Sequence, residues 1–102
     1  MLNEQIRNQS DLRNDPRNLE IAKLLGMKIP VVFSPLTDPY DERSVLNRLN
    51  ELGCCVKLVY YPNKKTRATV DAAVGFTHRV SISDNRGEAL VDAAIAVLNN
   101  GT

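Results

Sequence analysis

The sequence of 102 residues has no tryptophan, a single histidine and only two cysteines, which stand next to each other. Adjacent side chains on a strand point to opposite faces, so Cys54 and Cys55 have a poor geometry for bridging each other. A reducing compartment is therefore expected. His78 and one thiol would leave a tetrahedral metal centre two ligands short, so we predict neither a metal nor a cofactor.

The sequence also lacks an excess of either charge and any long apolar run. Thirteen basic and twelve acidic side chains give a net charge of +1, so no global field favours nucleic acid or an anionic membrane. No apolar segment approaches the roughly 18–20 residues of a membrane span, and the polar N-terminus lacks the apolar core of a signal peptide. We therefore expect a cytoplasmic protein without a membrane partner.

The length fits one domain with a real hydrophobic core. Residues 1–14 carry only Leu2, Ile6 and Leu12 as large aliphatic side chains, and we expect them to form a flexible polar arm. Residues 15–102 then form a single α/β domain.

Capping residues predict three helices, over residues 15–26, 38–53 and 85–101. The first two open with Asp-Pro, and all three end at a glycine, which readily adopts the left-handed conformation that terminates a helix. Asn85 and Glu88 have the spacing of a capping box before the third helix.

Two runs of alternating apolar and polar residues, 54–61 and 67–74, predict a pair of antiparallel strands. Placing both apolar sets on one face sets Lys57 opposite Asp71 and leaves residues 62–66 as the loop. This opposite-charge pair did not enter the choice of register, so it supports that register independently.

A third and a fourth strand complete the predicted sheet. A short turn at residues 75–77 returns the chain with Val80 opposite Ala72, which assigns Arg79 to the polar face. The apolar run 29–33 precedes the second helix, and a right-handed crossover would lay it parallel to the first strand of the hairpin. The predicted fold is a mixed four-stranded sheet with an antiparallel meander, packed by three helices like an alpha-beta-alpha sandwich.

The last helix is apolar around most of its circumference, with Glu88 and Asp92 as one thin polar stripe. Such a helix must be covered on more than one side. We predict that the small residues Ala89, Ala93 and Ala96 pack against a second copy of the chain and form a homodimer. A monomer in which residues 1–14 fold back over this surface is the alternative.

The layout of the chain resembles a family of small phage alpha-beta-alpha sandwich domains, over about residues 16–98. The resemblance rests on a short helix ending in Leu-Gly, a Ser- and Asp-containing turn that opens a second helix, a strand hairpin, and an Ala-rich last helix. The segments that carry it are NLEIAKLLG, FSPLTDPYDERSVLNRLNELG and GEALVDAAIAVL. The resemblance implies a phage or prophage accessory protein and supplies no catalytic residues.

Basic and aromatic residues gather on the predicted loop and on the polar face of the sheet. The candidate ligand-binding residues are Lys57, Tyr61, Lys64, Lys65, Arg67, Arg79 and, at the rim, Tyr40. Tyr61, Arg67 and Arg79 would stack on and pair with an anionic ligand. The alternative interpretation is an ordinary solvated face of a one-sided antiparallel sheet.

Nucleophilic catalysis requires a nucleophile, a base and an orienting group in contact. His78 is predicted on the face opposite to Cys55, and helix capping accounts for Asp38 and Asp41. We therefore predict that the protein is not an enzyme.

The sequence favours a non-enzymatic phage accessory protein that binds a host factor or a ligand and self-associates. One alternative is a sponge that sequesters an anionic cyclic nucleotide through Arg67, Arg79 and Tyr61. Another is a weak nucleic-acid-binding protein that uses the Lys64-Lys65 tip of the loop.

Overall fold

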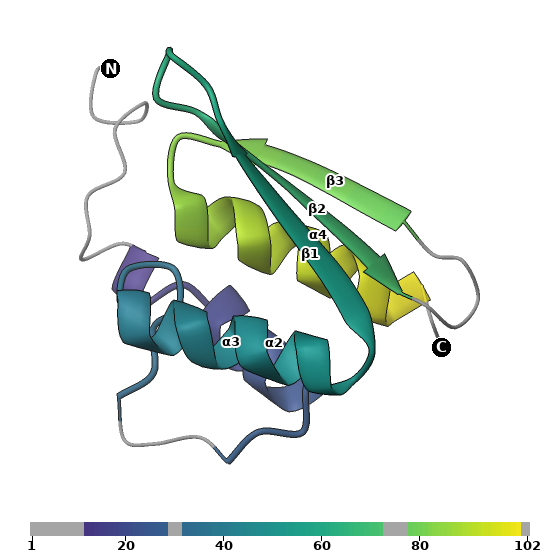
Figure 1. Cartoon of the computed structure of the whole chain (residues 1–102). Coiled ribbons are helices and arrows are strands. Elements are labelled where there is room, and N and C mark those ends of the chain that lie inside the picture. Colours follow the sequence, from purple (N-terminus) through teal and green to yellow (C-terminus); the bar gives the residue numbers. More distant parts are fainter. Residues whose placement is uncertain (1–11, 29–31, 73–77, 101–102) are drawn as a thin grey trace.

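The computed structural model describes residues 12–28, 32–72 and 78–100. These residues form three helices and one antiparallel sheet with the strand order β1-β2-β3 (Figure 1). The elements are α2 (Arg17–Leu24), α3 (Pro39–Glu51), β1 (Cys54–Tyr60), β2 (Thr66–Ala72), β3 (His78–Ser83) and α4 (Arg86–Asn100). The predicted combination of three helices with an antiparallel meander is confirmed.

The fourth strand predicted over residues 29–33 is not shown. Residues 29–31 lie outside the described ranges, and Val32 and Phe33 have no regular secondary structure. Phe33 is buried in the core, and Ser34 N donates to Asp41 Oδ2 at 2.8 Å. This contact joins the segment to the first turn of α3. The described sheet contains only the antiparallel pairs β1-β2 and β2-β3.

The predicted helix start at Asp38-Pro39 is confirmed, and the one at Asp15-Pro16 lies one residue later than predicted, with Pro16 as the N-cap. Asp38 caps α3, because its Oδ1 accepts from Tyr40 N at 2.8 Å and Pro39 occupies the first helical position. Asp15 Oδ1 accepts from Arg17 N at 2.9 Å, and α2 begins there, one residue after Pro16.

The cap of α4 is present with one change. Asn85 Oδ1 accepts from Glu88 N at 2.8 Å, which is half of the predicted capping box. The return contact passes through Ser83, whose Oγ lies 2.6 Å from Glu88 Oε1 and accepts from Asn85 N at 3.1 Å. A hydroxyl from the end of β3 thus joins the strand to the first turn of α4.

The predicted register of β1 and β2 is wrong by two residues. Lys57 lies opposite Thr69 rather than Asp71. The loop is one residue earlier than predicted, because Tyr61 N donates to Lys65 O at 2.9 Å and closes a turn over residues 61–65. A shift of two preserves the faces, since side chains alternate with a period of two.

The predicted register of β2 and β3 is wrong by an odd number, which reverses the faces of β3. Val80 lies opposite Thr69, and Arg79 lies opposite Val70. The predicted turn at residues 75–77 lies outside the described ranges, which stop at Ala72 and resume at His78. Val80 is accordingly exposed, whereas Arg79 belongs to the face that the helices cover.

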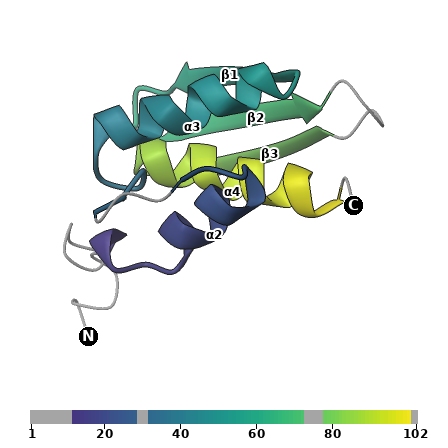
Figure 2. The same ribbon diagram turned by 90° about the horizontal axis from the view of Figure 1, so that it is seen from below.

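The helices pack on one face of the sheet. Figure 1 and Figure 2 show α3 along β1 and α4 along β2 and β3, with α2 against α4 on the side away from the sheet. The core between them is made of aliphatic side chains, the largest fully buried ones being Ile21, Leu25, Leu36, Val45, Leu49, Val70, Leu90, Val91 and Val97. No helix of the described residues covers the other face, which we call the open face.

Leu12, which the sequence analysis assigned to the polar arm, is buried in this core. The Asn18 side chain holds it there by donating to Leu12 O at 2.8 Å and to Arg13 O at 3.1 Å. Asn18 Oδ1 also accepts from Leu36 N at 3.1 Å. One buried amide therefore ties the start of the described chain to the loop before α3.

Two of the three alanines predicted to meet a second copy, Ala89 and Ala93, are covered within one chain, whereas Ala96 is half-buried. Ala89 and Ala93 are fully buried within a single chain, between the sheet and the other helices. The polar stripe faces α2, where Arg17 lies 2.7 Å from both Glu88 Oε2 and Asp92 Oδ1. The other elements of the same chain thus supply the cover that the helix requires.

Candidate ligand-binding pocket

The structure separates the residues that the sequence analysis grouped on the polar face. Lys57 and Arg67 lie exposed on the open face, and Tyr61 follows β1 on the same side by strand alternation. Arg79 lies on the opposite face and donates to His78 O at 2.8 Å. The predicted set of Tyr61, Arg67 and Arg79 is therefore not brought together.

The two loop lysines differ in their surroundings. Lys64 occupies the turn with a positive φ of 69° and is exposed. Lys65 Nζ lies 3.3 Å from Asp84 Oδ1, so part of the predicted positive charge of the loop is neutralised.

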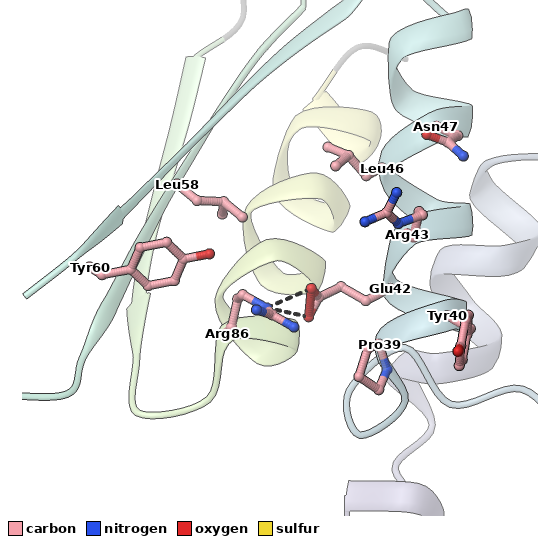
Figure 3. A pocket seen from close by; sticks show the side chains of 9 residues that line it. All are labelled: Pro39, Tyr40, Glu42, Arg43, Leu46, Asn47, Leu58, Tyr60 and Arg86. Atoms are coloured by element: carbon pink, nitrogen blue, oxygen red, sulfur yellow. Dashed lines mark hydrogen bonds and ion pairs between the residues drawn. The ribbon is translucent and has the colours of Figure 1, made fainter.

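A pocket of about 510 Å³ opens between α3 and the edge strand β1. It is lined by Pro39, Tyr40, Glu42, Arg43, Leu46, Asn47, Leu58, Tyr60 and Arg86 (Figure 3). Of the residues predicted from the sequence, only Tyr40 belongs to it.

Local structure explains how these side chains converge. Residues three and four apart share one side of a helix, so Glu42, Arg43 and Leu46 project from α3 together. Leu58 and Tyr60 alternate onto the helix-covered face of β1. In Figure 3 they point toward the space into which Arg43 and Leu46 extend, whereas Tyr40 lies at the outer rim.

Arg86, the first residue of α4, closes one end of the pocket. Its Nε lies 2.7 Å from Glu42 Oε2 and 3.0 Å from Oε1. The pKa of Arg86 is raised, first by the hydrogen bond and charge of Glu42 and then by Tyr60. Arg43 forms no ion pair with any residue of the described part of the chain. Two guanidinium groups and one carboxylate therefore leave the pocket with a charge of +1.

The sequence analysis missed the main wall of this pocket. Arg43 and Leu46 look like ordinary solvent-exposed and core-facing positions of an amphipathic helix, and Tyr60 was assigned to the apolar face. Their proximity depends on the packing of α3 against β1. The one local sign in the sequence was Arg86, a basic residue at a helix start, three residues after the end of β3.

The open face holds the remaining reactive side chains. Cys55 lies opposite Asp71, and Asp71 lies opposite His78, whose Nδ1 contacts Asp71 Oδ1. His78 thus shares a face with Cys55, contrary to the prediction, but Asp71 separates the thiol from the imidazole. Within the described ranges, no group of three His, Cys, Asp or Glu residues is arranged to hold a metal ion.

Comparison of the chain with protein-family models, with curated proteins and with solved structures gives no match. None of the helices in residues 12–28, 32–72 and 78–100 has the length and apolar character needed to cross a membrane.

Proposed function

We propose that the protein is a binding protein that holds a small, ring-bearing anion in the pocket between α3 and β1. The observation that carries the proposal is the convergence of Arg43 and Arg86 with Tyr60 above an apolar floor of Leu46 and Leu58. Ligand pockets typically combine an apolar lining with a few convergent polar groups, and their volumes run from about 300 to 1,000 Å³.

Each part of the pocket suits one part of such a ligand. Guanidinium groups bind phosphate or carboxylate oxygens through paired, charge-assisted hydrogen bonds. Tyr60 is 61% exposed and presents a ring on which a planar ligand can stack. Leu46 and Leu58 are half-buried, so a ligand ring would remove their remaining apolar surface from water.

The proposed activity is binding rather than catalysis. The pocket lining contains no Ser, Thr, Cys, His or Lys, and its one carboxylate, on Glu42, is already paired with Arg86. Tyr40 and Tyr60 are the only hydroxyl groups in this lining, and the carboxylate that could serve one of them as a base is held by Arg86, so the lining favours binding over acyl or phosphoryl transfer. A role in a phage or prophage is proposed from the layout of the sequence alone.

Calorimetric titration with 5′-AMP and 3′,5′-cyclic AMP tests the proposal. At least one nucleotide is expected to bind saturably, and Arg43→Gln should weaken binding about tenfold or more, since a charge-assisted hydrogen bond contributes about 1.5–3 kcal/mol. Arg67→Gln on the open face is the matched control and should leave the affinity unchanged. If only the Arg67 variant loses binding, the ligand binds on the open face and the proposed pocket is wrong.

Nucleic-acid binding through the loop is the competing proposal, and Lys64 is its exposed cation. An affinity for any duplex that falls steeply with salt and is lost in Lys64→Gln would favour it. Self-association stays a prediction, although Ala89 and Ala93 are buried within a single chain. Light scattering at micromolar concentration checks it, and a mass near 11 kDa would contradict it.

A further inference from the structure

We infer that the pocket between α3 and β1 selects a monoanion of the phosphodiester class, such as a cyclic nucleotide, over a dianionic phosphate monoester. This inference rests on the proposed function, because it concerns the charge of the ligand that the pocket binds. The predicted preference for a monoanion follows from the carboxylate of Glu42, which lines the same pocket as Arg43 and Arg86.

Glu42 is a fixed part of the pocket. Only 14% of its side chain is exposed, and both of its carboxylate oxygens lie within 3.0 Å of Arg86 Nε. An incoming anion cannot displace it into bulk water without breaking this pair. The ligand therefore meets two guanidinium groups together with one negative charge.

The ion pair also orients Arg86. It occupies Nε, and Tyr60 is a second hydrogen-bond partner of the guanidinium group, so the N–H groups of the terminal nitrogens that Tyr60 does not engage can donate to a ligand oxygen. Arg43 reaches the same space from α3 (Figure 3). The two guanidinium groups can thus bind the two non-bridging oxygens of one phosphodiester, and the net charge of +1 matches its single negative charge.

Among the described residues around the pocket, carboxylates outnumber the cations that remain for a second negative charge on the ligand, since Lys65 is paired with Asp84. Two neighbouring pockets share Pro39 with this one and contain Asp38, Asp41 and Asp84 against Arg13. A phosphate monoester carries a charge of about −1.5 to −2 at neutral pH. Its additional charge would lie in the same pocket as the Glu42 carboxylate, and like charges repel.

The test compares 3′,5′-cyclic AMP with 5′-AMP at neutral pH, since the two share base and sugar and differ in the charge of the phosphate. Calorimetry should show the cyclic diester binding about tenfold more tightly. Glu42→Gln raises the pocket charge to +2 and should strengthen 5′-AMP binding more than cyclic AMP binding. The ratio of the two dissociation constants, 5′-AMP over cyclic AMP, should therefore fall. Glu51→Gln, on the same helix but paired with Arg48 away from the pocket, should leave the ratio unchanged.

A third ligand, the linear dinucleoside monophosphate ApA, separates the two sources of a diester. Tighter binding of ApA would support a diester within a nucleic-acid strand, and tighter binding of cyclic AMP would support a free cyclic nucleotide. If 5′-AMP binds the unaltered protein as tightly as the diesters, the inferred preference for a monoanion is wrong, whereas the proposed binding of an anion in the pocket is retained. If none of the three binds, the proposed function itself fails.

Discussion

Replacing Gly87 by alanine tests how α4 is seated against the loop before α3. Alanine is normally the better helix residue, and the change from glycine is worth about 0.8–1.0 kcal/mol in a helix interior. At Gly87, however, a Cβ would overlap the carbonyl oxygen of Pro35 and lie 3.1 Å from Leu36 Cα. Both obstacles are backbone atoms, which cannot rotate away.

Overpacking a tightly packed site typically costs about 1–3 kcal/mol. Because the obstacle at Gly87 is backbone, the cost should lie at the upper end and outweigh the gain in helix propensity, leaving a net loss of about 1–2 kcal/mol. Urea unfolding followed by circular dichroism measures this difference, with an unchanged m-value showing that only stability has altered.

Ser44→Ala, at an exposed position of α3, is the control and should change stability by less than about 0.5 kcal/mol. Gly87→Ala should also weaken ligand binding, because displacement of the first turn of α4 moves the adjacent Arg86 away from Glu42. A variant as stable as the parent or more stable would refute the close approach of α4 to this loop.

Three further predictions concern the core and the thiols. Asn18→Ala should cost about 2–4 kcal/mol in a denaturant melt, because it leaves buried backbone groups without their partners. Leu49→Ala should cost about 2–5 kcal/mol, whereas Leu52→Ala, at a position 46% exposed, should cost less than about 1 kcal/mol. Ellman's reagent should modify Cys55 in the folded protein and Cys54 only after unfolding, since burial shields Cys54 and raises its pKa; two fast-reacting thiols would contradict this.

Features that depend on local chemistry were predictable from the sequence. The Asp-Pro pairs mark two helix starts, and Gly26 and Gly53, both with positive φ, follow the ends of α2 and α3, because capping needs only a few neighbouring residues. The predicted stop at Gly101 lies outside the described residues. The faces of β1 and β2 were also predictable, since an error of two residues in register leaves side-chain alternation intact.

Features that depend on tertiary packing were not predictable. The register of β3 against β2 decides which side chains of β3 face the helices. A shift of one residue in that register would turn Val80 toward the helices and Arg79 toward the open face. The pocket requires α3 to lie along β1 and α4 to begin beside Glu42, which no spacing within one element reveals. Tyr40 could be named because it lies near a helix cap, where the sequence signal is strongest.

The polar stripe of α4, Glu88 and Asp92, links α2 to the turn of α4 that contains the pocket residue Arg86. Arg17 of α2 binds Asp15, Glu88 and Asp92, with its Nη2 2.7 Å from Glu88 Oε2. Its pKa is raised, first by the hydrogen bond to Asp15 and then by those to Glu88 and Asp92, against the opposing effect of burial.

Glu88 transmits this contact to the start of α4. Its other carboxylate oxygen lies 2.6 Å from Ser83 Oγ, and its backbone N–H donates to Asn85 Oδ1 at 2.8 Å. These bonds fix the turn that contains Arg86, so the docking of α2 helps to place a guanidinium group of the pocket. An Arg17→Met variant should therefore weaken anion binding even though residue 17 does not line the pocket, and calorimetry showing an unchanged affinity in a folded variant would disprove the connection.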